Sequence, residues 1–171
     1  MAARSKVTAV RNEVLDKFEE VVDYFADVSA EYLTMQIESE GRFSNSKWPD
    51  LSSATLVIRS SEGILSDIIG YRTGSMLRSL VVEKQGRFKI KIYFKIPKVQ
   101  LDTFEMGAVI KITPKMVKWL AYHGVYISTS KERIYVPARP IYEPVVPLIE
   151  TALNRKLAEL KIPVRAKVRV T

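Results

Sequence analysis

One amphipathic pattern, running from about Lys6 to Ile37, restricts the fold of this chain more than any other feature. Apolar residues recur along it at steps of three and four, and Glu, Asp and Lys fill most positions between them. Such steps place side chains on one face, so the pattern predicts one long helix with a single face to bury. We expect the helix to close at Gly41, because glycine readily adopts the left-handed conformation found at helix ends. The apolar face consists of Val10, Val14, Phe18, Val21, Phe25, Val28, Tyr32 and Met35, widened by Leu15, Val22 and Leu33.

A strand pattern with a period of two supplies a surface against which this helix can pack. Leu80–Glu83 and Arg87–Ile96 are predicted to form a hairpin around Lys84-Gln85-Gly86. In the second strand, alternate residues are apolar or largely basic, which predicts one packed side and one solvent-facing side. The apolar set is Phe88, Ile90, Ile92, Phe94 and Ile96, and the other set is Arg87, Lys89, Lys91, Tyr93 and Lys95.

Shorter elements complete the predicted fold, which is of the α+β class. The long N-terminal amphipathic helix and a C-terminal helix are expected to pack on a small antiparallel sheet, with residues 1–160 forming a single domain. Asp50 or Ser52 is expected to cap a short helix, and Thr113 with Pro114 to start another. The remaining predicted elements are helices 54–59, 115–122 and Glu143–Leu160, a helical turn Met76–Leu80, and strands Val109–Ile112 and Ile134–Val136.

The C-terminal segment 161–171 alternates apolar with basic residues. It is predicted to be either an edge strand or a basic arm that pairs with a neighbouring subunit, because unpaired strand edges readily add to another sheet.

The residues available argue against an enzyme. Among 171 residues there is no cysteine, which excludes disulfides, thiolate nucleophiles and cysteine-based metal sites. The one histidine, His123, lies at the predicted end of a helix, where capping or packing is favoured over catalysis. No phosphate-binding loop or dinucleotide-binding motif is present. We therefore expect no enzymatic activity, no metal and no cofactor.

Neither a signal peptide nor a membrane segment is expected. The basic N-terminus is not followed by an apolar run of the required length, and no stretch approaches the ~20 apolar residues that span a bilayer. The sequence thus predicts a protein that remains in the compartment where it is made.

Positive charge is concentrated in three segments of the chain. Lys and Arg total 27 against 19 Asp and Glu, a net charge of +8. Two interpretations are open: the basic residues contact nucleic acid through its phosphates, or they coat solvent-facing surfaces and discourage aggregation. The candidate residues for contact with DNA or a partner are Lys89, Lys91 and Lys95 in the second strand, and Arg165, Lys167 and Arg169 in the tail.

Three collinear segments after the long helix carry a family resemblance. Trp48-Pro49-Asp50-Leu51-Ser52 with Thr55, Thr73-Gly74-Ser75-Met76-Leu77-Arg78-Ser79-Leu80, and Val136-Pro137-Ala138-Arg139-Pro140-Ile141 resemble the W-x-x-L-s-x-x-T, T-G-x-L-x-x-S-I and I-P-A-R-P-F motifs of the virion-morphogenesis or tail-completion family of tailed bacteriophages and Mu-like prophages. The resemblance spans roughly residues 42–160. Met76, Ile141 and the loosely matching 104–107 segment depart from the family pattern.

The resemblance implies a structural virion protein that completes the tail or neck and joins head to tail. It implies a homo-oligomeric ring, neighbours among the connector, tail-terminator, sheath or tube proteins, non-specific contact with packaged DNA, and residence in the host cytoplasm during assembly. A basic nucleic-acid-binding module is the alternative, and a hydrolase is the enzyme-class alternative. The assembly or structural residues that the resemblance identifies are Trp48, Leu51, Thr55, Thr73, Gly74, Pro137, Arg139 and Pro140.

Overall fold

A computed structural model describes residues 2–64, 75–128 and 130–169, with backbone alone for 2–11 and 75. The elements are α1 (Ala2–Glu38), a 3-10 turn (Arg42–Ser44), α2 (Ser53–Ser61), α3 (Ser75–Arg78), β1 (Leu80–Gly86), β2 (Lys89–Phe94), α4 (Lys98–Met106), β3 (Ala108–Lys111), α5 (Pro114–Tyr122), β4 (Arg133–Val136) and α6 (Val146–Glu159). The predicted α+β class is confirmed, with the antiparallel strands arranged as two separate pairs, β1–β2 and β3–β4.

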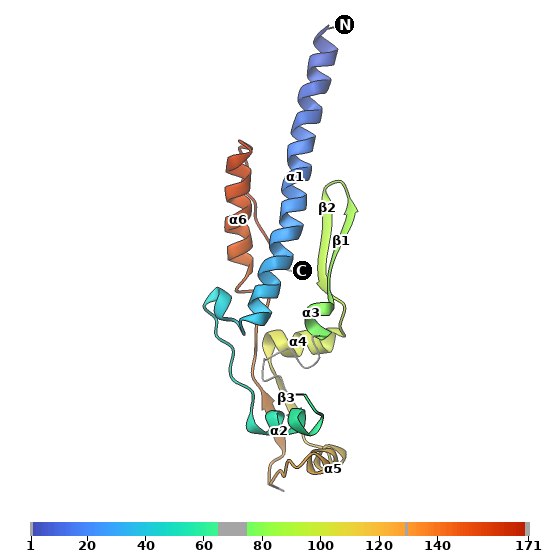
Figure 1. Ribbon diagram of the computed structural model, residues 1–171, viewed down its shortest axis with the longest axis vertical. Helices are drawn as coiled ribbons and strands as arrows, with labels where there is room; N and C mark the ends of the chain where they lie inside the picture. Colours follow the sequence, from blue (N-terminus) through green and yellow to red (C-terminus); the bar gives the residue numbers. More distant parts are fainter. Residues whose placement is uncertain (1, 65–74, 129, 170–171) are drawn as a thin grey trace.

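The molecule is elongated along α1. Figure 1 shows α6 on one side of this helix and the β1–β2 hairpin on the other, with α4 beyond its C-terminal end. The elements α2, β3, β4 and α5 form a distal module at the end of the molecule farthest from the N-terminus (Figure 1). The two β pairs therefore lie in different parts of the molecule, β1–β2 beside α1 and β3–β4 in the distal module.

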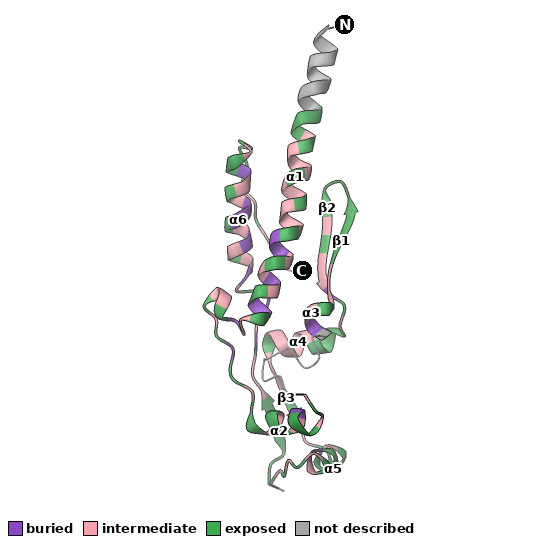
Figure 2. Ribbon diagram, viewed as in Figure 1, coloured by how far each residue is buried: buried purple, intermediate pink, exposed green. Residues whose placement is uncertain are grey.

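The main core lies where the C-terminal half of α1 meets α6 and the beginning of the hairpin (Figure 2). Its burial pattern confirms the amphipathic prediction for most of the second half of α1, but Met35, which was predicted on the apolar face, is 38% exposed. Nearer the N-terminus, α1 extends past α6 and the hairpin, and Val14 is 46% exposed. The apolar face of α1 is thus only partly covered within one chain. The buried core cluster comprises Val28, Leu33, Ile37, Trp48, Met76, Phe94, Ile141, Val145, Ile149, Ala152 and Leu153.

Gly41 closes α1 as predicted. Its φ is +84°, and its N–H donates to the carbonyl of Gln36 at 2.9 Å. A Cβ at this position would lie 2.0 Å from the Ser46 carbonyl oxygen and 2.7 Å from a ring carbon of Trp48. The tight turn that brings Trp48 back onto the end of α1 therefore requires glycine.

The predicted position of the hairpin turn was wrong. The turn lies at Arg87-Phe88, and β1 continues to Gly86 through an irregular register between Lys84 and Gly86. Phe88, predicted on the packed side, is 49% exposed. In the observed register the hairpin pairs with α1: Lys84 binds Asp23 at 2.8 Å, and Arg87 binds the carboxylates of Asp16 and Glu19.

Other elements also differ from the predictions, most of them by a few residues at their ends. Strand β2 ends at Phe94, α6 begins at Val146, and α4 occupies a stretch for which no element was predicted. The later start of α6 follows from Pro144, since residues 142–145 form a turn in which Val145 N–H bonds to the Tyr142 carbonyl at 3.0 Å.

The described part of the C-terminal segment, 161–169, contains no strand. It runs back along α6, where the Asn154 side chain accepts from Ala166 N–H at 2.9 Å and donates to the Ala166 carbonyl at 3.4 Å. Ala166 and Val168 pack against the core. The described segment is thus not an edge strand, and its contacts are with its own subunit.

Candidate assembly surfaces

The first and third resemblance motifs meet at the carbonyl of Pro140. Trp48 is 2% exposed, and its indole Nε1 donates to this carbonyl oxygen at 3.1 Å. The same oxygen accepts from Nε2 of the buried Gln36 at 3.2 Å. The ring of Trp48 also packs edge-on against Phe104, with centroids 5.6 Å apart. The end of α1, the loop after it, α4 and the approach to α6 are thereby fixed together at a single point.

Arg139 binds the loop that follows Trp48. Its Nε and Nη2 donate to the Pro49 carbonyl at 3.3 and 3.2 Å, and Nη2 also reaches the Asp50 carbonyl at 3.4 Å. The residue is 9% exposed, and burial lowers the pKa of its guanidinium from the ordinary value. Its backbone N–H donates to the Phe104 carbonyl at 2.6 Å. Arg139 therefore joins two motifs inside the subunit.

Glu105 anchors the residues just after Pro140. Its Oε1 accepts the backbone N–H groups of Ile141 at 3.0 Å and Tyr142 at 3.1 Å. Burial raises the pKa of Glu105 above the ordinary value, and the two hydrogen bonds oppose this rise. Gly107, two residues on, has φ +73°, and a Cβ there would lie 2.6 Å from the Val136 carbonyl oxygen. The sequence did not predict roles for Gln36, Phe104 and Glu105; the loosely matching segment 104–107 was a signal for Phe104 and Glu105, and Gln36 had none.

Substitution of Glu105 separates its role as an acceptor from its charge. Glu105→Ala leaves two N–H groups without their partner, so we expect the free energy of unfolding to fall by about 1–3 kcal/mol. Glu105→Gln keeps the acceptor and should match or exceed the wild type at pH 7. The pKa of Glu105 is raised above 4.5 in the folded state, so the folded wild type keeps its carboxyl proton to higher pH than the unfolded chain does. The stability of the wild type therefore falls as the pH rises from 4.5 through the folded-state pKa of Glu105.

The pH dependence is measured by urea denaturation of the wild type and Glu105→Gln between pH 4 and 8. The glutamine variant should lack the component of stability that the wild type loses over this interval. Equal slopes for both proteins would contradict the assignment.

The remaining predicted motif residues have local roles. Leu51 is half-buried against the core, Pro137 is half-buried beside β4, and the Thr55 N–H is capped by Ser52 Oγ at 3.2 Å. Of the two capping candidates, Ser52 is the cap of α2. Thr73 and Gly74 lie outside the described residues.

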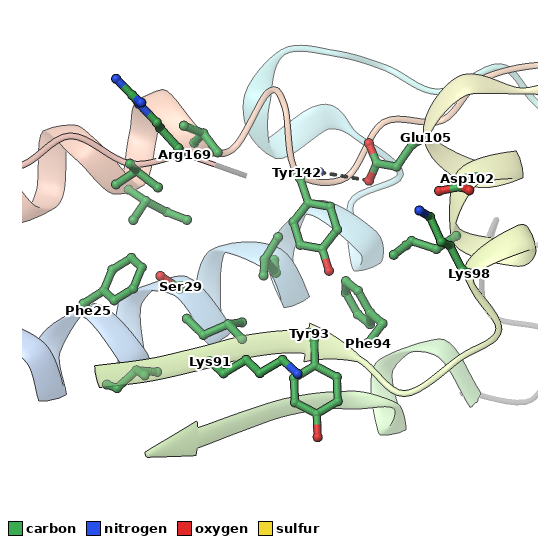
Figure 3. A pocket seen from close by; sticks show the side chains of 17 residues that line it. Phe25, Ser29, Lys91, Tyr93, Phe94, Lys98, Asp102, Glu105, Tyr142 and Arg169 are labelled. Carbon is green, nitrogen blue, oxygen red and sulfur yellow. Dashed lines mark hydrogen bonds between the residues drawn. The ribbon is translucent and has the colours of Figure 1, made fainter. Parts of the chain in front are cut away.

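A groove of about 770 Å³ lies between α1, β2, α4, α6 and the C-terminal arm (Figure 3). Apolar side chains such as Leu33 and Ile149 form much of its wall. Burial raises the pKa of Tyr142 in this wall to about 12, so its hydroxyl stays neutral at physiological pH. Lys91 and Arg169, two of the predicted basic residues, both line the groove. The structure thus brings a residue from the hairpin together with one from the arm around an apolar surface.

The other predicted basic residues do not form one cluster. Lys89 and Lys95 are exposed at the two ends of β2, and Arg165 and Lys167 are exposed on the arm. The predicted wet side of the hairpin is confirmed for Lys89 and Lys91, and Lys91 lies over the ring of Tyr93 at 4.7 Å.

His123 has packing partners that fit its predicted structural role. It ends α5, its Nδ1 lies 2.6 Å from Ser61 Oγ of α2, and its ring contacts Trp119 and Tyr122. This contact joins α2 to α5 within the distal module.

Two further findings concern the described residues only. They contain no group of three or more His, Cys, Asp or Glu side chains placed to hold a metal ion. No helix among them is both long and apolar enough to cross a membrane.

Comparison with known proteins gives no relative for this chain: no family model, no curated protein and no solved structure matches it.

Proposed function

We propose that this chain is a structural subunit of a tailed phage particle, which completes the tail or neck and joins head to tail as part of a ring. The convergence of the resemblance motifs carries the proposal. Trp48, Arg139 and Pro140, taken from segments about 90 residues apart, form one hydrogen-bonded junction. A junction of this kind gives the first and third motif-bearing segments a common physical reason to occur together in one chain.

The shape of the molecule also supports a role in assembly. An elongated subunit with an apolar groove, a partly uncovered α1 and a weakly packed distal module presents large surfaces to neighbours. Neck and tail proteins, such as a connector, a tail terminator, or sheath and tube subunits, are the proposed neighbours. The virion is the proposed location, and no catalytic step is assigned.

The location is tested by labelling purified virions with gold-conjugated antibodies against this chain and imaging them in negative stain. The proposal expects gold at the junction of head and tail. Virions that contain the chain only elsewhere, or preparations that lack it, would contradict the proposal.

Exposed basic residues favour nucleic-acid binding as the second candidate function. Lys89, Lys91, Lys95, Arg165, Lys167 and Arg169 are all exposed. In a ring that surrounds exiting DNA, such residues would attract phosphates without regard to base sequence. Tight binding to one DNA sequence over unrelated DNA at physiological salt, seen in a gel shift, would favour a dedicated nucleic-acid-binding module over the assembly protein.

The basic side chains of the arm are expected to act in particle joining. Deletion of residues 161–171 would also remove the packing of Ala166 and Val168, so substitution is the sharper test. The triple variant Arg165→Gln, Lys167→Gln and Arg169→Gln keeps these contacts and should remain folded by circular dichroism. In complementation of a phage lacking the gene, it should leave tails and filled heads separate. Normal yields of joined virions would reject this role.

A further inference from the structure

The distal module buries little of its own surface. Among the described residues of α2, β3, β4 and α5, only Arg59 and Leu120 are buried. A two-stranded sheet is marginally stable unless its faces are covered. The low burial of the module therefore indicates that contact with another molecule covers part of its surface.

One face of the β3–β4 sheet is wholly exposed. Val109 and Tyr135 pair across the strands and are 61% and 70% exposed. Two residues further along the same face, Lys111 pairs directly with Arg133. Like charges placed opposite each other destabilise a sheet, and neither residue forms an ion pair with another described residue. We call Val109, Lys111, Arg133 and Tyr135 the distal face. Its chemistry fits a partner that carries negative charges next to an apolar surface.

The chain itself carries a surface of this kind on α1. Asp27, Glu31 and Glu38 are exposed, share one face of the helix, and form no ion pair with another described residue. Met35, four residues after Glu31, is 38% exposed beside them. By contrast, the acidic residues nearer the N-terminus are neutralised within the chain by the hairpin and α6; these are Asp16, Glu19, Glu20 and Asp23, paired with Lys84, Arg87 and Lys156.

The two surfaces lie on separate parts of the elongated molecule and do not meet within one chain (Figure 1). We propose that the distal face of one copy binds the Asp27–Glu31–Glu38 face of α1 in a second copy. The contact is head-to-tail, because it joins two different surfaces, so a pair of copies still presents one unused distal face and one unused α1 face. Repeated contacts of this type close into a ring or extend into a filament. The inference deepens the proposed ring-forming role and rests on it for its biological meaning.

A nucleic acid is the other polyanion that Lys111 and Arg133 could attract. The adjoining exposed Val109 and Tyr135 favour a protein, because a protein surface can bury both while it neutralises the two charges. The complementary α1 face on the same chain identifies a second copy as that protein.

The test uses the purified full-length chain and two charge-reversal variants. The first is Lys111→Glu with Arg133→Glu, and the second is Asp27→Lys with Glu31→Lys. Sedimentation velocity over a concentration series should show self-association of the wild type. Each variant alone should associate roughly tenfold or more weakly, because it presents the same sign of charge on both surfaces. An equimolar mixture of the two variants should associate again, since opposite charges are restored across copies.

Arg155→Glu with Lys161→Glu is the matched control, because it reverses two exposed basic residues outside both surfaces. It should associate like the wild type. Restored association in the mixture also shows that the variants are folded. The proposal is overturned if the wild type stays monomeric at about 1 mM or if the mixture does not associate. It is also overturned if the first variant associates like the wild type and, in a gel shift, loses binding to random-sequence DNA. None of these readouts requires a phage, so failure here is distinct from failure of virion localisation.

Discussion

Replacing Trp48 with alanine is expected to lower the free energy of unfolding by about 3–5 kcal/mol. The side chain is almost fully buried, packs edge-on against Phe104, and donates to the Pro140 carbonyl. The alanine variant loses this packing, leaves a cavity, and removes one of the two donors to that carbonyl. The junction between α1, α4 and the approach to α6 loses its central side chain.

Trp48→Phe is the matched variant, because it keeps an aromatic ring and removes the indole donor. Its cost should be smaller, closer to the roughly 1 kcal/mol of one hydrogen bond together with some packing, since Gln36 still donates to the Pro140 carbonyl. Urea denaturation followed by far-ultraviolet circular dichroism measures both. A loss below about 1 kcal/mol for Trp48→Ala would show that this junction does not stabilise the fold.

Arg139→Ala is expected to cost roughly 1.5–3 kcal/mol, since hydrogen bonds from a charged donor to the carbonyls of Pro49 and Asp50 are lost. Arg139→Lys should recover only part of this loss. A lysine ammonium lacks the planar fork through which two nitrogens share the Pro49 carbonyl, although it retains the positive charge.

The Arg139 pair also distinguishes a structural role from a direct contact with a partner. If Arg139 acts inside the subunit, both variants should lower thermal stability in the isolated protein, and the alanine variant should lower it more. An alanine variant as stable as the wild type, but defective in particle joining, would reassign Arg139 to an interface.

Local signals in the sequence were sufficient for several elements. The long helix followed from its stripe, its end from Gly41, and α5 from Thr113, whose Oγ1 accepts from Met116 N–H at 3.3 Å. Each of these depends on residues within about one helical turn of each other. The physical cause is therefore contained in the sequence pattern itself.

Predictions failed where distant residues decide the outcome. The local pattern placed the hairpin turn at 84–86 and gave no sign that Lys84 and Arg87 pair with Asp16, Glu19 and Asp23, which lie more than 60 residues earlier on α1. Helix α4 was missed although Leu101 and Phe104 are spaced for one helical face, because few other apolar residues extend the pattern.

The residues of the candidate site also divide into those that the sequence identifies and those whose role depends on distant contacts. Sequence resemblance selected Trp48, Arg139 and Pro140, but no sequence pattern singles out Gln36 or Glu105, which bind beside them. Gln36 looks like one polar residue within the helix, and Glu105 like one carboxylate among many. Their roles depend on contacts across 104 and 36 residues, respectively, which only the folded chain reveals.

The central claim, that this chain joins phage heads to tails, is tested most directly by counting particles made without it. In a phage that carries the gene, an in-frame deletion should yield DNA-filled heads and complete tails that remain separate in electron micrographs. The wild-type gene supplied in trans should restore joined virions. Joined, infectious virions from the deletion strain at normal yield would contradict the account.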